Sequence, residues 1–192
     1  MQTYVALLRG INVSGQKSIL MADLKGLFES LKFKDVRTYI QSGNVVYRER
    51  DGKAGRAGEA GRAGGSARKI EKAILKRFGF EVTVLVRTAE ELAGILGNNP
   101  FGKSGLGEGD KVYISFLSAI PENALVKAQA PVSKDGDRWI FKGSEAYILC
   151  KHGFGKTVFS NGYLEKKLGV RATTRNLQTV AMLHVLASSP GK

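Results

Sequence analysis

The sequence has one cysteine, two histidines and four prolines, and these shortages exclude several classes of protein. A single cysteine, Cys150, cannot form an internal disulfide, which fits a reducing cytoplasm. No GxSxG, HExxH or CxxC motif occurs, so the familiar serine hydrolases and zinc sites are excluded. We therefore predict no catalytic residue, no metal and no cofactor.

Long apolar runs are also missing. No stretch approaches the roughly 18 residues that a membrane-spanning helix needs. The first residues, MQTYVALLRG, lack the basic segment and small-residue cleavage site of a signal peptide, so we interpret their apolar run as a first strand. We expect a cytoplasmic protein with no membrane partner.

Positive charge is present in excess. The chain has 30 Lys and Arg residues against 17 Asp and Glu residues, which gives a formal net charge of +13 at pH 7. The excess is spread over both halves of the sequence, without a basic tail. Such a charge favours association with polyanions, and nucleic acid is one partner that it suits. A solvated basic surface is the alternative.

The hydrophobic pattern of the first half predicts the element order β-α-β-β-α-β. Strands are expected at about residues 3–9, 36–40, 44–48 and 81–87, and helices at about 20–32 and 67–78. The first helix is indicated by apolar residues spaced three and four apart: Leu20, Leu24, Leu27, Phe28 and Leu31. This order is the split arrangement of ferredoxin-like domains.

A segment rich in glycine, alanine and arginine lies between the hairpin and the second helix. Glycine falls at every third position from Gly52 to Gly64, but without proline these triplets cannot sustain a collagen helix. We interpret residues 51–66 as a flexible, exposed loop.

The second half begins like a repeat of the first. Thr88 and Glu91 form a Thr-x-x-Glu capping box that opens a helix to about Leu96, and the turn-rich segment 98–110 is the expected linker. Strands are then predicted at 111–117, 137–141 and 145–150, and helices near 121–128, 161–168 and 174–187. A last strand is not evident. We predict an α+β protein with ferredoxin-like halves at 1–97 and 111–192, the second half incomplete and followed by C-terminal helices.

The same element order occurs in RNA-recognition motifs, which stack bases on aromatic residues of an open sheet. Here the third strand offers valines and Tyr47 alone, and the first strand, VALL, is apolar on both alternating faces. We expect both faces of the sheet to be covered.

Residues 8–18, LRGINVSGQKS, come close to a nucleotide-binding P-loop. Gln16 stands between Gly15 and Lys17, which breaks the G-x-x-x-x-G-K-[ST] spacing, and the split strand order does not suit a P-loop. No aspartate closes an apolar strand to hold magnesium, so we do not expect nucleotide hydrolysis. Arg9, Asn12 and Lys17 remain candidate ligand contacts. The alternative is that Asn12 and Gly15 only shape a turn and that Arg9 pairs with a carboxylate.

The segment GVRATTRNLQTVAML (169–183) suggests a second anion contact. Thr173 or Thr174 is a suitable N-cap, which would place Arg175 in the first turn of the helix, beside free N–H groups. A cation there suits a phosphate or carboxylate ligand. The alternative is an ion pair between Arg175 and Glu165 or another carboxylate.

Three motifs together resemble the domain of unknown function 1697 family of small bacterial proteins: LLRGINV (7–13), VRTYIQSGNVVY (36–47) and LEKKLGVRATTRN (164–176). The resemblance implies an α+β fold of two ferredoxin-like halves and carries no established activity. It marks as family-pattern positions Arg9, Gly10, Asn12, Gln41, Ser42, Gly43, Asn44, Thr174, Arg175 and Asn176. We expect the loop after the first strand and the hairpin to emerge at opposite ends of their half, so that either could meet Thr174–Asn176 but not each other.

These observations favour a non-catalytic protein that binds a small anionic ligand bearing phosphate or carboxylate. The candidate ligand-binding residues are Arg9, Asn12, Lys17, Gln41, Asn44, Thr174, Arg175 and Asn176. One alternative is a nucleic-acid-associated protein that uses its basic surface. The other is an enzyme of unfamiliar type in which Gln41, Ser42 and Asn44 orient a substrate.

Overall fold

The computed structural model describes residues 1–13, 15–49, 64–102, 106–127 and 132–189. The chain divides into two compact units: unit 1 comprises Met1–Ala93 and Met182–Lys192, and unit 2 comprises Gly94–Ala181. Most of the predicted Gly/Ala/Arg loop at 51–66 lies outside the described residues, and residues 64–66 belong to a helix. None of the described helices is long and apolar enough to span a membrane.

Unit 1 contains a four-stranded antiparallel sheet with the strand order β2-β3-β1-β4. Its elements are β1 (Gln2–Leu8), α1 (Met21–Ser30), β2 (Lys34–Tyr39), β3 (Asn44–Glu49), α2 (Gly64–Phe78) and β4 (Val84–Thr88). This order and connectivity are those of a ferredoxin-like domain, as predicted. The second helix begins earlier than the apolar pattern suggested, and β4 begins later.

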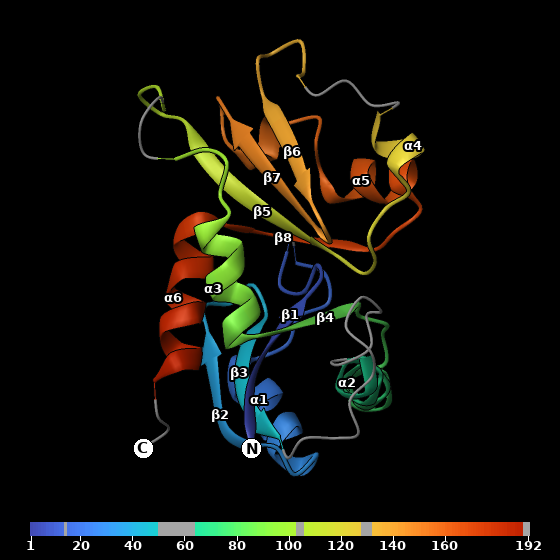
Figure 1. Cartoon of the computed structure of the whole chain (residues 1–192). Helices are drawn as coiled ribbons and strands as arrows, with labels where there is room; N and C mark the ends of the chain where they lie inside the picture. Colours follow the sequence, from blue (N-terminus) through green and yellow to red (C-terminus); the bar gives the residue numbers. More distant parts are fainter. Residues whose placement is uncertain (14, 50–63, 103–105, 128–131, 190–192) are drawn as a thin grey trace. The chain divides into compact units, whose positions relative to one another are not determined.

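The core of unit 1 lies between one face of this sheet and the helices α1 and α2 (Figure 1). Tyr4, Ala6 and Leu8 of β1 belong to this core. Val5 and Leu7, which alternate with them and point to the opposite face, are also fully buried. The prediction that both faces of the first strand are covered is confirmed, which argues against an open base-stacking sheet.

Unit 2 contains a second antiparallel sheet, in the order β6-β7-β5-β8. Its elements are β5 (Lys111–Leu117), α4 (Asn123–Lys127), β6 (Arg138–Lys142), β7 (Glu145–Cys150), the short 3₁₀ turn η1 (Phe154–Lys156), α5 (Asn161–Leu168) and β8 (Ala172–Asn176). Two further helices, α3 (Ala89–Gly97) and α6 (Leu177–Ser188), follow β4 and β8 respectively and cross the boundaries of the units. The expected α+β class is confirmed.

The last strand of the second half is present, and the prediction of an incomplete half is wrong. Residues 172–176, ATTRN, pair with β5 instead of opening a helix, with Ile114 opposite Arg175. Threonine is both a good N-cap and a good strand residue, so the local sequence is ambiguous, and the pairing with β5 decides between them. The helix begins at Leu177, where the Asn176 Oδ1 accepts the Thr179 N–H at 2.7 Å.

The two units repeat each other down to individual backbone hydrogen bonds. Leu8 N–H donates to the Gly43 carbonyl at 2.8 Å, and Leu117 N–H donates to the Ser144 carbonyl at 2.9 Å. The next residue along each first strand bonds to the segment before the fourth strand, namely Arg9 to Thr83 and Ser118 to Arg171, both at 2.9 Å. The duplication is therefore one of register as well as of fold.

The same register makes Arg87 of β4 equivalent to Arg175 of β8. Arg87 lies opposite Val5, and Arg175 lies opposite Ile114. Each guanidinium donates to the carbonyl of its preceding residue, at 3.0 Å and 2.8 Å. The next residue in each unit caps the helix that follows. Thr88 forms the predicted capping box with Glu91, and Asn176 accepts the Thr179 N–H.

The only cysteine, Cys150, is buried in the core of unit 2 beside Trp139 and Ile148. Burial raises the pKa of its thiol to about 11, so the folded protein keeps the thiol protonated.

We expect the Cys150 thiol to resist 5,5′-dithiobis(2-nitrobenzoic acid) at pH 8 and to react fully once the protein is unfolded in guanidinium chloride. The unfolded thiol ionises near pH 9, so this group should lower stability progressively as the pH rises from about 9 to about 11. Rapid stoichiometric reaction of the folded protein at pH 8 would contradict this burial.

Candidate functional site

Three segments of unit 1 meet at the end of the sheet where β1 finishes. They are the loop formed by residues 9–13 and 15–20, the turn 40–43 between β2 and β3, and residues 79–83 before β4. Backbone hydrogen bonds join them, from Leu8 N–H to the Gly43 carbonyl and from Arg9 N–H to the Thr83 carbonyl. We call this region the β1 end of unit 1.

The prediction that the loop and the hairpin emerge at opposite ends is wrong. β3 runs antiparallel to β1, so the first residue of β3, Asn44, lies opposite Leu7 near the end of β1. The turn that leads into β3 must therefore lie beside the loop that leaves β1. The sequence positions Arg9, Asn12, Lys17 and Gln41 are brought to one end of one unit.

The loop itself is a small hairpin. Asn12 N–H donates to the Lys17 carbonyl at 3.3 Å, and Gln16 N–H donates to the Val13 carbonyl at 3.0 Å. These two N–H groups bond within the loop and do not converge on a common centre, as a phosphate cradle requires. The antiparallel sheet likewise differs from the parallel α/β sheet to which a P-loop belongs.

The side chain of Asn12 ties the loop to the turn. Its Nδ2 donates to the carbonyls of Ile19 and Gln41, both at 2.9 Å, and its Oδ1 accepts the Ile19 N–H at 2.8 Å. Asn12 is thus committed to structure, as the turn-chemistry alternative proposed. Asn44 has a similar role: it is fully buried, and its Nδ2 donates to the Tyr39 carbonyl and the Ser42 hydroxyl, both at 3.0 Å.

Left-handed backbone is concentrated at the β1 end. Of the five described non-glycine residues with positive φ, three lie here: Asn12 at 56°, Lys17 at 48° and Ile40 at 48°. Such a conformation is uncommon for lysine and a clear outlier for a β-branched residue. Sparsely populated backbone conformations persist only where the surroundings impose them, and they cluster at functional sites.

The candidate side chains that reach solvent here are Arg9, Lys17 and Gln41, and the same segments also expose the polar side chains of Gln16, Ser18 and Glu81. Arg9 is half-buried, whereas Lys17 and Gln41 are exposed. The Lys17 Nζ donates to the Glu81 carbonyl at 2.7 Å, so the ammonium is anchored to the segment before β4. The bond from Lys17 to the Glu81 carbonyl was not predicted, because it joins residues that are 64 positions apart, and no signal in the sequence marked the left-handed backbone of Ile40.

Large apolar side chains are also exposed at the β1 end. Val13, Leu20 and Ile40 expose 57%, 71% and 49% of their surface. Each is the sequence neighbour of a residue that takes part in the Asn12 hydrogen bonds. Charged and apolar groups are therefore presented together on a framework held by side-chain and backbone bonds.

The remaining candidates lie in β8 of unit 2 and have structural contacts. The Thr174 hydroxyl bonds to the Ser115 hydroxyl and donates to the Asn161 Oδ1 at 2.6 Å, which joins β5, β8 and the start of α5. Asn176 caps α6. These two side chains are used within unit 2.

Arg175 does not lie in the first turn of a helix, contrary to the prediction. It is a strand residue and is buried, and its Nη1 donates to the Thr173 hydroxyl at 2.9 Å and to the Thr174 carbonyl at 2.8 Å. Burial lowers the pKa of its guanidinium to about 10. The described residues contain no group of three or more His, Cys, Asp or Glu side chains placed to hold a metal ion.

Residues 1–147 match the family model described as a protein of unknown function, DUF1697. The chain belongs to the DUF1697 family. The matched residues of this DUF1697 chain include all three segments of the β1 end, whereas Thr174, Arg175 and Asn176 lie beyond them. The resemblance seen in the sequence motifs is confirmed.

Among solved structures, the DUF1697 chain is similar to the conserved bacterial protein SP0830 from Streptococcus pneumoniae. The two share 18% sequence identity with a TM-score of 0.66, over 97% of this chain and 99% of that chain. At this identity the likeness establishes the fold alone. No curated protein matches the chain.

Proposed function

We propose that this protein binds a small anionic ligand, without catalysis, at the β1 end of unit 1. Arg9 and Lys17 supply positive charge, and Gln41 supplies a hydrogen-bonding amide. The observation that carries the proposal is the concentration of left-handed backbone on the two segments that bear these side chains. Strain of this kind costs roughly 1–3 kcal/mol per residue, and a fixed ligand-binding geometry accounts for keeping it.

The chemistry of the two cations favours phosphate or carboxylate. An ammonium group has three donors, and the Glu81 carbonyl takes one of those on Lys17. Its attachment to that carbonyl also restricts the side chain before a ligand arrives, which reduces the entropy lost on binding. The exposed Val13, Leu20 and Ile40 suit a ligand that carries an apolar body as well as its anionic group.

Three parts of the sequence-based hypotheses change. Arg175 is withdrawn as a helix-start contact, because it lies in β8. The amide of Asn12 holds the framework and is not offered to the ligand. An enzymatic role for Ser42 and Asn44 is less favoured, because these side chains bond to each other inside the turn.

Thermal unfolding with inorganic phosphate, adenosine monophosphate and citrate tests the proposal. A ligand at tenfold its Kd stabilises a protein by about 1.4 kcal/mol, which raises the Tm by about 3–6 °C for a chain of this size. We expect Lys17→Ala to abolish the shift given by at least one of these anions and Arg9→Ala to reduce it.

Lys32→Ala is the matched control. Lys32 is also an exposed lysine with positive φ, but it precedes β2 at the other end of the sheet of unit 1. It should leave the ligand-induced shift unchanged. The proposal fails if none of the three anions raises the Tm, or if Lys17→Ala and Lys32→Ala behave alike.

A further inference from the structure

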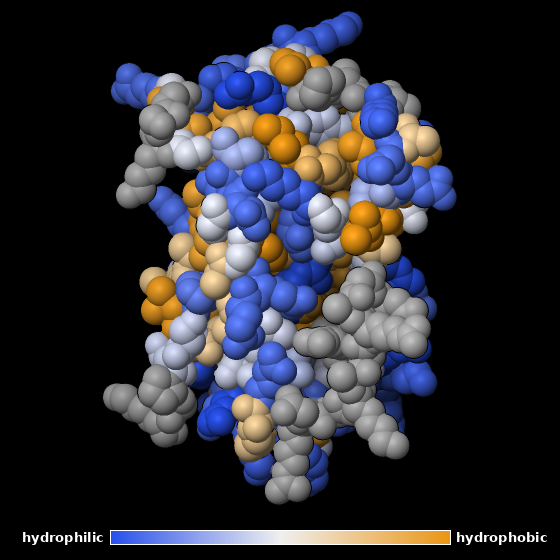
Figure 2. All heavy atoms as spheres, in the orientation of Figure 1, coloured by the Kyte–Doolittle hydropathy of each residue, from blue (hydrophilic) through white to orange (hydrophobic). Residues whose placement is uncertain are grey.

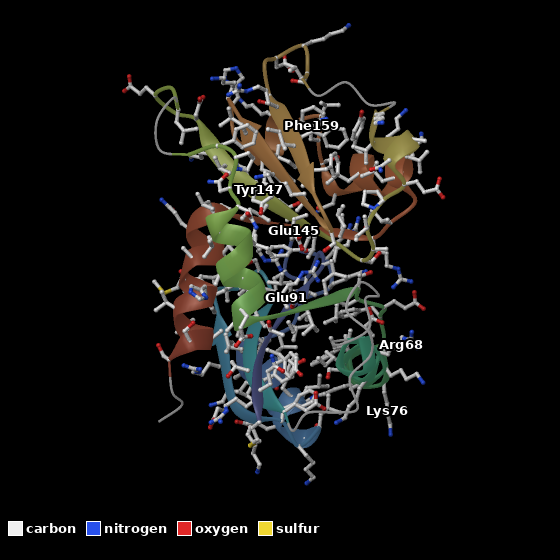
Figure 3. The ribbon with its side chains drawn as sticks, in the orientation of Figure 1. Arg68, Lys76, Glu91, Glu145, Tyr147 and Phe159 are labelled. Atoms are coloured by element: carbon white, nitrogen blue, oxygen red, sulfur yellow. The ribbon has the colours of Figure 1, made fainter. Side chains whose placement is uncertain are left out.

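The helix α2 of unit 1 has one face in the core and one row of cations facing outward. Ile70 and Ile74 are fully buried in the core of unit 1. Arg68, Lys72 and Lys76 are exposed, and they recur every four residues, which places them along one side of the helix. Figure 3 shows Arg68 and Lys76 extending from α2 on its outer side, and Figure 2 shows hydrophilic atoms there.

The other charged residues of α2 are directed to neighbouring elements. The Lys69 Nζ donates to the Leu31 carbonyl at 2.8 Å and lies over the Phe33 ring. Arg77 pairs with Asp23 at 3.3 Å. The carboxylate of Glu71 accepts the Val84 N–H at 2.9 Å, so it points to the sheet and not to the row of cations.

Within the described part of the chain, no carboxylate forms a salt bridge with Arg68, Lys72 or Lys76. A solvated surface commonly mixes charges of both signs, whereas this row has one sign only. At a rise of about 1.5 Å per residue, the three cations occupy about 12 Å of the helix, with a spacing of about 6 Å. A duplex carries one negative charge per about 1.7 Å of its axis, so a row of this length lies against several phosphates.

We propose that this row, Arg68, Lys72 and Lys76, docks the protein on the phosphate backbone of a nucleic acid without reading its sequence. Charge complementarity supplies the affinity, through release of the counterions that the phosphates hold. An anionic membrane is the less favoured partner. A helix that lies in a membrane interface needs a free apolar face, whereas the apolar face of α2 is used in the core of unit 1.

The experiment measures fluorescence anisotropy of labelled 20-base-pair DNA and RNA duplexes of random sequence as the protein is added. The wild-type protein should bind at about 50 mM salt. Three phosphate contacts contribute a slope of about −2.7 in log affinity against log salt, which corresponds to a loss of about 40-fold between 50 and 200 mM. The combined variant Arg68→Glu, Lys72→Glu, Lys76→Glu should bind at least about tenfold more weakly and lose that part of the slope.

A matched variant changes the same charge on unit 2: Lys127→Glu, Lys166→Glu, Lys167→Glu. These lysines are exposed and lie on α4 and α5. They should alter affinity by less than about threefold. The variant Arg68→Gln, Lys72→Gln, Lys76→Gln removes the charges without reversing them. Circular dichroism of each variant separates loss of docking from loss of fold.

Three outcomes overturn the proposal. Equal losses in the two charge-reversal variants would mean that net charge alone drives binding. Failure of the wild type to bind either duplex at about 50 mM salt would exclude a nucleic-acid partner. Binding to vesicles of phosphatidylcholine and phosphatidylglycerol, without binding to either duplex, would assign the row to a membrane surface. None of these outcomes depends on the ligand site at the β1 end.

Discussion

Replacing Gly43 with alanine is expected to lower the free energy of unfolding by about 2–5 kcal/mol. Gly43 ends the turn between β2 and β3 with a φ of 78°, and left-handed backbone costs a residue with a Cβ about 1–2 kcal/mol. The added Cβ would also lie 2.8 Å from the Ile11 Cδ1 and 2.9 Å from the Leu8 Cβ. Overpacking at a buried position adds about 1–3 kcal/mol. Urea unfolding followed by far-ultraviolet circular dichroism measures the change.

Gly10→Ala is the control that separates the two causes. Gly10 has nearly the same φ, 67°, but nothing lies within 4 Å of the position that its Cβ would take. Alanine there should therefore cost only the backbone term, about 1–2 kcal/mol. If the two variants lose the same stability, the close packing of the turn against Ile11 and Leu8 does not contribute.

The periodic elements of this fold were predictable from the sequence. Leu24, Leu27 and Phe28 recur at helical spacing, and the structure buries all three on one face of α1. The Thr88 and Glu91 capping box forms as its spacing predicts, with bonds of 2.7 Å and 3.1 Å. In these cases the cause is local, because both the apolar face and the cap lie within a few residues of one another.

The strand β8 was missed because its cause is distant. Its five residues lie between two helices, and Thr173 and Thr174 are equally suited to a helix start. Pairing with β5, some 60 residues earlier in the sequence, fixes the segment as a strand through Ile114 opposite Arg175. The true cap is Asn176, which the local pattern placed inside the helix.

The composition of the β1 end could be predicted in part. The motifs LLRGINV and IQSGN supply Arg9, Asn12 and Gln41, and the resemblance marked them as a set. Their proximity follows from the antiparallel pairing of β1 with β3. The predicted element order implies this pairing, but the sequence analysis placed the loop and the hairpin at opposite ends of their half. The sequence did not show that Asn12 holds the framework whereas Arg9 and Gln41 reach solvent, because the bond from Asn12 to the Gln41 carbonyl joins residues that are 29 positions apart.

Replacing Asn12 with aspartate is expected to lower the free energy of unfolding by about 2–4 kcal/mol at pH 7. Aspartate has the same shape and also tolerates left-handed backbone, so the φ of 56° adds little to the difference. The carboxylate keeps the bond from Ile19 N–H but loses both Nδ2 donors. It then sets a negative charge against the carbonyl oxygens of Ile19 and Gln41. Urea unfolding at pH 7 measures the loss.

The loss should depend on pH in a way that identifies its cause. Two facing carbonyl oxygens disfavour the anion, so the pKa of the new carboxyl is raised in the folded state above its unfolded value of about 3.9. The destabilisation is therefore complete above the folded pKa and shrinks as the pH falls toward about 3.9, where the protonated group again donates to one carbonyl. Asn98→Asp, an exposed change of the same charge, should stay within about 0.5 kcal/mol of wild type. A loss for Asn12→Asp that is constant from pH 7 to pH 4 would show that the two carbonyl contacts of Asn12 do not hold the loop to the turn.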